Sequence, residues 1–289
     1  GQVTPFVDAN VSVATNALQY GIAFFGGTKG YYQKNGSIGI FRLDEHLERM
    51  ARSTKILRFP YNFDVKKIKE IFIELTKLNK PNGNVYYRSF VYRSDIALSP
   101  AIDGEYDFAL YMLNAGDYFD KSRGLKVCVS SWVRNSDNAL PPRTKASGGY
   151  VNAALAMHDA VASGFDAAIL LDSSGHVGEG AVMNFFMVRD NLIITPAVSA
   201  DILEGITRKT VLELAAEIGY KVEERQIDRS ELYVADEIFF SGTATELTWA
   251  ESVDNVVIGR EPGPVFTKQK QGFKNILNNP EDNRLTIVK

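Results

Sequence analysis

Lys145 is the residue whose surroundings best suit covalent chemistry. It lies in the segment 141–150 (PPRTKASGGY), among small and turn-forming residues that precede an apolar helical pattern. An amine that forms a Schiff base must lose its proton and its water shell, and burial among small residues favours both. The alternative is an ordinary solvated lysine in a strand-to-helix connection, which is the commoner setting for this residue type.

Two turns and one arginine have the chemistry to bind a phosphate. Residues 203–208 (LEGITR) open directly into an apolar helical pattern, so the free amides of that helix start face whatever precedes them. Residues 241–245 (SGTAT) end an apolar strand, where backbone amides and a threonine hydroxyl can meet an anion. Arg49 flanks a buried helical stripe, from which its guanidinium can reach inward. Taken singly, these features also fit a capped helix, a plain turn and a solvated arginine beside Glu45.

Several other chemistries lack their motifs. The sequence has no Gly-Lys dipeptide for a Walker A loop, no Gly-x-Ser-x-Gly elbow and no His-Glu-x-x-His zinc helix. Residues 178–183 (GEGAVM) begin like a dinucleotide fingerprint, but Met183 stands where the third glycine belongs. His46, His158 and His176 are far apart, and a single cysteine adds no closely spaced ligand, so we expect no metal site.

Composition narrows the possible partners and compartment. The 289 residues carry 32 Lys and Arg against 35 Asp and Glu, a formal charge of -3, without a basic block that would follow a phosphate backbone. Nucleic acid is therefore not expected as a partner. Neither a membrane span of about 18 apolar residues nor the regions of a signal peptide occur. The lone Cys128 lies in an apolar alternation, which predicts a buried strand thiol, and we expect a cytoplasmic protein.

The first half predicts an antiparallel sheet with helices on one side. Apolar residues at helical spacing predict helices over 43–57, opened with the help of Asp44, and over 65–78, capped by Asp64. Strands are predicted at 39–42, 85–93 and 106–113. This half has the pattern of an α+β module.

A polar, glycine-containing stretch divides the chain. We expect a first domain over residues 1–114, an interdomain loop over 115–124 and a second domain over 125–289. In the second domain, strands are expected around Cys128 and at 167–171, 184–188, 192–195, 221–226 and 237–241, with helices at 150–163, 206–218 and near 265–276. Helix 150–163 is expected to present one face made of Val151, Ala154, Leu155, His158 and Val161, with His158 near the core.

Four segments together resemble a known family. Residues 145–152 (KASGGYVN), 178–186 (GEGAVMNFF), 205–208 (GITR) and 241–246 (SGTATE) are similar, in order and separation, to segments of the fold-type IV pyridoxal-phosphate aminotransferases, and most closely of the branched-chain amino acid aminotransferases. The resemblance covers nearly the whole chain. It implies an α/β (α+β) fold of two domains, a small α+β domain and a larger β-barrel-like domain flanked by helices. It also implies a homodimer, or an assembly of dimers.

The resemblance assigns a set of residues to pyridoxal 5′-phosphate. Lys145 would form the Schiff base with the cofactor, Tyr150 would hydrogen-bond its ring oxygen, and Glu179 would face the pyridine nitrogen. The phosphate would be bound by Arg49, Gly205, Ile206, Thr207 and Thr243. Once displaced by the substrate, the lysine amine would carry the proton between the substrate α-carbon and the cofactor.

Substrate residues follow from the same resemblance. Tyr86 and Arg88 lie two apart on a predicted strand, so they leave the same face, and they match the Tyr-x-Arg pair of the family. Tyr86, with the amides near Thr243 and Ala244, would hold the α-carboxylate, and Arg88 the distal carboxylate of glutamate. Tyr20 and Phe25 would supply aromatic walls, with core packing as the alternative for each. The implied reaction passes an amino group from leucine, isoleucine or valine to 2-oxoglutarate by a ping-pong mechanism.

One segment departs from the family pattern. Where the branched-chain enzymes usually have Phe-Glu-Gly-Ile-Arg, residues 25–29 are FGGTK. We expect the loss of that charged pair to loosen the wall beside the substrate side chain, which would favour other acceptors or primary amines. Alternatives are therefore a D-amino acid or (R)-amine transaminase, or an aminodeoxychorismate lyase, which Tyr86 and Arg88 disfavour. A non-catalytic binding protein of the same fold remains a further alternative.

Overall fold

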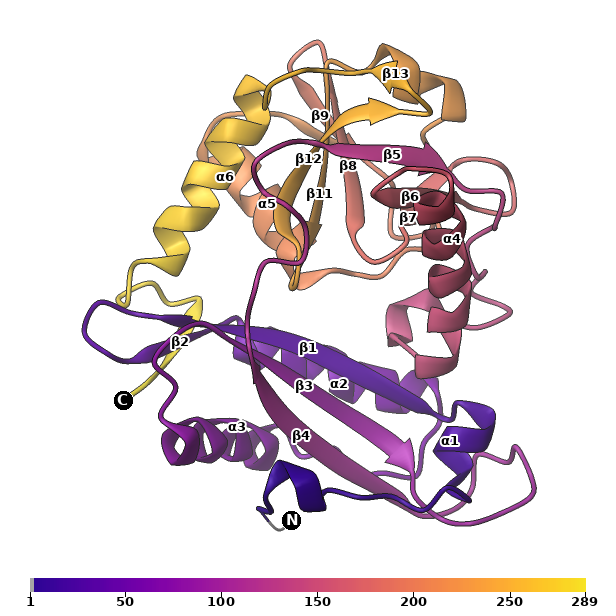
Figure 1. Cartoon of the computed structure of the whole chain (residues 1–289), viewed down its shortest axis with the longest axis vertical. Helices are drawn as coiled ribbons and strands as arrows, with labels where there is room; N and C mark the ends of the chain where they lie inside the picture. The colour runs from indigo at the N-terminus through magenta and orange to yellow at the C-terminus, as the bar shows by residue number, and fades with distance from the viewer. Residues whose placement is uncertain (1–2) are drawn as a thin grey trace. The chain divides into compact units, whose positions relative to one another are not determined.

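The computed structural model describes residues 3–289, and the chain forms two compact units (Figure 1). Unit 1 comprises residues 3–116, Thr144–Gly148 and Leu277–Lys289, and unit 2 comprises Asp117–Arg143 and Gly149–Ile276. The first division falls within the glycine-containing stretch. Residues 144–148 and 277–289, which we expected in the second domain, instead belong to unit 1, because each pairs with a strand of its sheet.

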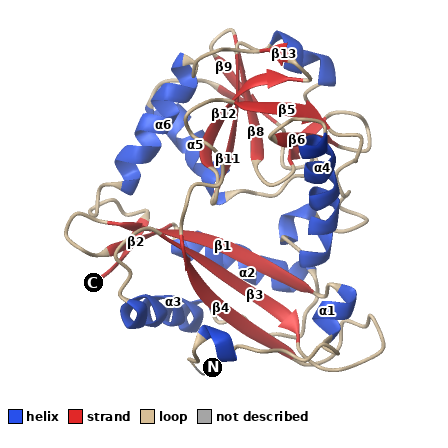
Figure 2. Ribbon diagram, viewed as in Figure 1, coloured by secondary structure: helices blue, strands red, loops and turns tan. Residues whose placement is uncertain are grey.

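Unit 1 is built on an antiparallel sheet with the strand order β14-β2-β1-β3-β4 (Figure 2). Its strands are β1 (Ala23–Tyr32), β2 (Ile38–Phe41), β3 (Val85–Arg93), β4 (Tyr106–Asn114) and β14 (Leu285–Val288). Strand β14 pairs with β2 from Leu285 opposite Phe41 to Val288 opposite Ile38. This pairing returns the C-terminal residues to the edge of the first sheet, which the sequence pattern did not indicate.

Two helices of unit 1 form where the apolar spacing predicted them. Helix α2 (Leu43–Ile56) buries Leu43, Leu47 and Met50, and these residues pack with the inward side chains of β1, β2 and β3. Helix α3 (Val65–Asn79) begins at Asp64, whose carboxylate accepts hydrogen bonds from two amides of the first turn at 3.0 and 3.1 Å. Asp44 lies in the first turn of α2, where a negative charge favours the helix start, and its carboxylate pairs with Lys69 at 2.8 Å.

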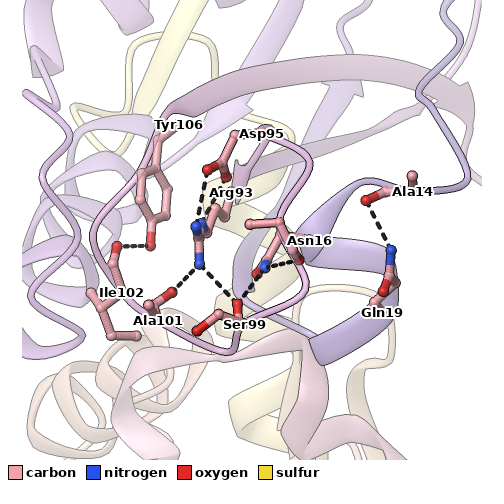
Figure 3. A network of polar contacts seen from close by, with 10 residues as sticks. Ala14, Asn16, Gln19, Arg93, Asp95, Ser99, Ala101, Ile102 and Tyr106 are labelled. Atoms are coloured by element: carbon pink, nitrogen blue, oxygen red, sulfur yellow. Dashed lines mark hydrogen bonds and ion pairs between the residues drawn. The ribbon is translucent and has the colours of Figure 1, made fainter.

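A short helix, α1 (Asn16–Tyr20), precedes β1 and is tied to the loop after β3. The Asn16 side-chain amide donates hydrogen bonds to the carbonyls of Ala97 at 3.2 Å and Ser99 at 2.7 Å (Figure 3). Arg93 holds the same loop through Asp95 at 2.7 Å and through the Ser99 carbonyl at 3.2 Å. These side chains hydrogen-bond loop carbonyls that have no partner in the sheet.

Unit 2 is built on a mixed sheet in the order β10-β9-β8-β11-β12-β5-β6-β7, with β13 attached to β12. Its strands are β5 (Leu125–Val129), β6 (Ala167–Leu171), β7 (Val177–Gly180), β8 (Asn184–Arg189), β9 (Leu192–Thr195), β10 (Val222–Glu224), β11 (Glu237–Gly242), β12 (Glu246–Val253) and β13 (Val256–Val257). Gly180 at the end of β7 bridges Met183 just before β8. The edge strand β7 therefore lies close to the start of β8, in the middle of the strand order. The sheet curves around a core to which both strands contribute side chains.

Three helices cover this sheet: α4 (Tyr150–Ala162), α5 (Ile206–Glu217) and α6 (Pro264–Leu277). Our expectation for the face of α4 is wrong. The residues that pack on β6 are alanines, among them Ala153, Ala156 and Ala160, whereas Val151 is 63% exposed and His158 is exposed. Small residues allow the close approach of a helix to a sheet, so the alanine stripe is the inner one.

Several short strands of unit 2 were not predicted. Strand β7 overlaps the motif at 178–183, and β12 and β13 follow the turn after β11. Strand β10 is shorter than the predicted 221–226. All five predicted helices, α2 to α6, are confirmed within a residue or two, as are the strands β2, β3, β4, β6, β8, β9 and β11.

Candidate active site

Lys145 lies in the segment 144–148 of unit 1, which is hydrogen-bonded to β1. Its carbonyl oxygen accepts from the Phe25 amide at 3.2 Å, and Ala146 forms a bridge pair with Phe24. The Lys145 backbone has a φ of 56°, a left-handed conformation that costs free energy for a residue with a side chain and clusters at functional sites. Its side-chain nitrogen lies 5.0 Å from the centroid of the Phe25 ring.

Tyr86 and Arg88 leave β3 on the face opposite the helix-packed core, as the alternation predicted. In the register with β1, Arg88 lies opposite Gly27. The Arg88 guanidinium carbon is 4.3 Å from the centroid of the Phe25 ring and 5.5 Å from that of Tyr86. A Cβ at Gly27 would overlap the Tyr86 hydroxyl, so the glycine makes room for this cluster. The structure thus brings Lys145, Phe25, Tyr86 and Arg88 together in unit 1.

Arg88 has unused hydrogen-bonding capacity. Among residues 3–289, its Nε is buried and has no hydrogen-bond partner. A buried donor of this kind costs free energy unless a ligand satisfies it. A planar guanidinium stacked on an aromatic ring is well suited to bind a carboxylate.

Arg49 lies on α2 and is 5% exposed. One turn earlier, His46 is 2% exposed, and both ring nitrogens lack a hydrogen-bond partner within the described part of the chain. Burial lowers the pKa of His46 well below its usual value, and the positive charges of Arg49, Lys145 and Arg42 lower it further. This coupling places the α2 side chains within electrostatic reach of Lys145. From the sequence we considered His46 only as a candidate metal ligand. Its position one turn before Met50, on the buried stripe of α2, was the signal that its ring is buried.

The unusual segment 25–29 divides between the two faces of β1. Gly26 faces α2, and a Cβ there would lie 2.6 Å from the Ser89 hydroxyl and 2.7 Å from the Met50 sulfur. The Ser89 hydroxyl donates to that sulfur at 3.1 Å. The expected loosening of the pocket wall is therefore wrong at Gly26, because neighbouring side chains fill its space beneath the strand.

Lys29, which also differs from the family pattern, lies on the same face of the sheet as Arg88. It is opposite Tyr86 in the β1–β3 register, is 4% exposed, and its Nζ lies 5.3 Å from the centroid of the Tyr31 ring. Tyr20 ends helix α1 and is 41% exposed, which excludes the core-packing alternative for this residue.

In unit 2, the Glu179 carboxylate is buried and held from both sides. Its Oε1 pairs with Arg134 at 2.6 Å, and its Oε2 accepts from the Asn184 side-chain amide at 2.9 Å and from the Leu203 amide at 3.2 Å. Such contacts keep a buried carboxylate ionised and oriented. We did not predict Arg134, and nothing in its local sequence marked it; Asn184 lay within the motif around Glu179.

Helix α5 begins beside this carboxylate. Its N-cap, Gly205, supplies no side-chain cap, while Ile206 and Thr207 in the first turn are 6% and 3% exposed. The first amides of a helix have no partners within the helix, and they carry the positive end of its dipole. This helix start therefore has the donors that a phosphate requires.

The turn from β11 to β12 contains Thr243 and Ala244, both half-buried. Gly242 pairs with Glu246, so three residues form the turn, and Glu246 has a φ of 55°. Ser241 Oγ and Thr245 Oγ1 are buried without hydrogen-bond partners among residues 3–289. Gly242 also lies beside the segment that follows Glu179, since a Cβ there would be 3.6 Å from the Val182 carbonyl oxygen.

Tyr150 is the first residue of α4 and is half-buried. The start of this helix is held by Asn135, whose side-chain amide donates to the Gly149 carbonyl at 3.3 Å, and by Asn152, which donates to the Val133 carbonyl at 2.9 Å. These bonds set the direction from which the Tyr150 ring leaves the helix.

The predicted site residues divide between the two units. Lys145, Arg49, Tyr20, Phe25, Tyr86 and Arg88 belong to unit 1, and Tyr150, Glu179, Gly205, Ile206, Thr207, Thr243 and Ala244 belong to unit 2. The donor set fits pyridoxal phosphate: an uncapped helix start and orphaned buried hydroxyls suit its phosphate, and the oriented carboxylate suits a pyridinium nitrogen. Residues 3–289 contain no cluster of metal-binding side chains. None of their helices is long and apolar enough to cross a membrane.

Comparison with known proteins gives a consistent result. Residues 28–253 match the family model of the class IV amino-transferases. A probable branched-chain-amino-acid aminotransferase of Synechocystis sp. is 42% identical, over 96% of this chain and 90% of that protein. The crystal structure of the branched-chain aminotransferase from Thermoproteus uzoniensis with norvaline is 34% identical, with a TM-score of 0.95 over 100% of this chain and 97% of that one.

A third similar structure is the T.th. branched-chain amino acid aminotransferase complexed with N-(5′-phosphopyridoxyl)-L-glutamate, 34% identical, with a TM-score of 0.91 over 98% of this chain and 95% of that one. The family model spans both units, and the two-unit fold agrees with that of these enzymes. The chain therefore belongs to the class IV aminotransferase family.

Proposed function

We propose that this aminotransferase moves an amino group between branched-chain L-amino acids and 2-oxoglutarate. In this proposal Lys145 is the lysine that binds pyridoxal phosphate covalently and transfers the substrate α-proton. The observation that carries the proposal is a cluster in which Lys145 and Arg88 lie over the Phe25 ring and Arg88 also lies over the Tyr86 ring. It combines an amine, a phenol and a guanidinium on one surface of unit 1. The names of the similar enzymes support the same substrates.

In this proposal the residues of unit 2 hold the cofactor. The start of α5, with Gly205, Ile206 and Thr207, binds the phosphate together with Thr243 and with Arg49 of unit 1. Glu179, oriented by Arg134 and Asn184, would accept a hydrogen bond from the pyridine nitrogen. Tyr150 hydrogen-bonds the ring oxygen. When bound, pyridoxal phosphate supplies an electron-accepting ring that stabilises the charge left when the substrate α-proton departs.

Lys145 moves the proton in this scheme. With the substrate bound, its free amine would accept the α-proton as a general base. Burial lowers the pKa of His46 on α2 well below its usual value, and the positive charges of Arg49, Lys145 and Arg42 lower it further.

The substrate is held by its carboxylates. Tyr86 and the amides near Thr243 and Ala244 bind the α-carboxylate, and Arg88 binds the distal carboxylate of glutamate or 2-oxoglutarate through its unsatisfied Nε. A similar enzyme has been crystallised with a phosphopyridoxyl adduct of L-glutamate. Phe25 and Tyr20 form apolar walls for a leucine, isoleucine or valine side chain.

A panel of amino donors tests this assignment, with the absorbance of the cofactor as the readout. L-Leucine, L-isoleucine, L-valine and L-glutamate should each convert the bound cofactor to its amino form. Faster conversion by D-alanine or (R)-1-phenylethylamine than by L-leucine would contradict the substrate assignment. Borohydride reduction followed by peptide mapping should label Lys145, and a preparation that binds no pyridoxal phosphate would contradict the enzymatic proposal.

The assembly and location belong to the same proposal. Large apolar side chains stand exposed on the chain, among them Phe6 at 67%, Ile96 at 67% and Leu98 at 88%. Exposed apolar surface of this kind favours a homodimer, or an assembly of dimers. Sedimentation velocity at micromolar concentration should give at least twice the 32.0 kDa mass of the chain. The single, unpaired Cys128 is in keeping with a cytoplasmic enzyme.

A further inference from the structure

Asn184, the first residue of β8, contacts both of the cofactor-binding elements assigned above in unit 2. Its side chain is almost fully buried, with 4% of the residue exposed. The side-chain nitrogen donates to Glu179 Oε2 at 2.9 Å and to the Leu203 carbonyl at 2.8 Å. Both protons of the amide are therefore used, one on the carboxylate and one on the segment that leads into α5.

The amide oxygen of Asn184 lies against the N-cap of α5. It occupies the space that a Cβ at Gly205 would require, so only glycine can approach Asn184 this closely. Leu203 is itself attached to Glu179, because its backbone amide donates to Oε2 at 3.2 Å. Glu179, Asn184 and residues 203–205 thus form one closed set of contacts.

These contacts are expected to be stiff. They are buried, two of them involve a carboxylate, and an unpaired partner would have no water to replace the lost bond. A displacement of Asn184 would therefore alter the direction of Glu179 and the position of the α5 start together. If Asn184 only filled space locally, the direction of Glu179 and the position of the α5 start would vary independently of each other.

We propose that Asn184 is a positioning residue that couples the carboxylate for the cofactor ring to the helix start for the cofactor phosphate. The proposal rests on the function proposed above, which assigns those two elements to the two ends of pyridoxal phosphate. Asn184 makes them one rigid piece, so that a change at Glu179 alters phosphate binding at α5. It touches neither the substrate nor the reacting atoms.

The test measures the dissociation constant of inorganic phosphate for the cofactor-free enzyme by ³¹P NMR, in a cycle of four proteins. These are the wild type, Glu179→Gln, Asn184→Ala and the double variant. We expect each single variant to weaken phosphate binding severalfold, and the double variant to be little weaker than either. Independent, multiplicative effects, or an Asn184→Ala protein that binds phosphate as the wild type does, would overturn the coupling.

Gly205→Ala provides a second variant that keeps every group of Asn184. The added methyl must displace the amide oxygen, so phosphate binding should weaken as in Asn184→Ala, and the absorbance of bound pyridoxal phosphate should change its pH dependence. Unchanged phosphate binding and an unchanged pH profile in Gly205→Ala would overturn the proposal, even if Asn184→Ala does not fold.

Asn16→Ala is the matched control. Asn16 is likewise buried and its side-chain amide likewise donates to two acceptors, but it lies in unit 1 (Figure 3). It should lower the melting temperature and leave the phosphate affinity within twofold of the wild type. An equal loss of phosphate binding in Asn16→Ala would mean that general destabilisation explains the Asn184 effect. A wild type that binds phosphate but not pyridoxal phosphate would count against the proposed function and not against the coupling.

Discussion

Replacement of Arg88 by glutamine should separate the two substrate classes of the proposed reaction. The Arg88 guanidinium stacks on Phe25 at 4.3 Å, and its Nε is buried without a partner among residues 3–289. A hydrogen bond to a charged group is worth about 1.5–3 kcal/mol, so one lost bond to the distal carboxylate corresponds to roughly tenfold to a hundredfold weaker binding of glutamate. Leucine has no distal carboxylate and should be affected less than about threefold in the same variant.

The cost to the fold should be small. Stacking of a cation on an aromatic ring contributes about 0.5–1 kcal/mol at partly exposed sites, and a glutamine side chain still covers much of the Phe25 ring. We therefore expect a melting temperature within a few degrees of the wild type, by the usual relation between free energy and melting temperature. Any loss of activity then reports on substrate binding.

The assay is a pair of single-turnover half-reactions, one with L-glutamate and one with L-leucine, followed by the absorbance of the bound cofactor. The concentration dependence of each rate separates binding from the chemical step. Lys29→Met is the matched control, because Lys29 on β1 is a second cation on the same face of the sheet as Arg88 on β3. Equal losses for leucine and glutamate in Arg88→Gln, or a glutamate-specific loss in Lys29→Met alone, would refute the role given to Arg88.

Three further predictions concern stability and the turn after β11. Glu237→Ala should lower the free energy of unfolding by about 1–3 kcal/mol in urea titrations, because the carboxylate accepts from two amides at the start of α6 at 2.8 and 2.9 Å; no change would contradict this capping role. Burial raises the pKa of Tyr87 from 10.0 to about 12. The unfolded chain then loses its proton first, so stability should fall as the pH rises from 10 towards 12, by about 1.4 kcal/mol per pH unit, and Tyr87→Phe should reduce that slope. Lys121 pairs with Glu246 at 3.0 Å and with Asp117; Lys121→Met should speed hydrogen exchange in residues 117–124, and a Glu246→Gln background should reduce the difference without removing it, because the pair with Asp117 remains.

Much of the fold followed from local patterns. Apolar spacing located α2, α3, α5 and α6, and Asp64 marked the start of α3, because these features depend on side chains one helical turn apart. Strand alternation correctly separated Tyr86 and Arg88 from the core-facing Tyr87. The inner face of α4 was misjudged, since its valines and leucine matched a buried stripe while the fully buried residues that α4 places against β6 are alanines. Which stripe is covered depends on the partner surface, which lies elsewhere in the sequence.

The candidate site shows the same division. The sequence by itself determined the family, and it singled out Lys145 and the motifs around Glu179, Gly205 and Thr243 as candidates, because such segments need particular residue types at short spacing. Only the tertiary structure decided that Arg134 and Asn184 hold Glu179, and that Met50 and Ser89 fill the space beside Gly26. Those contacts join residues far apart along the chain, and their energy comes from burial and geometry that exist only after the sheets have formed.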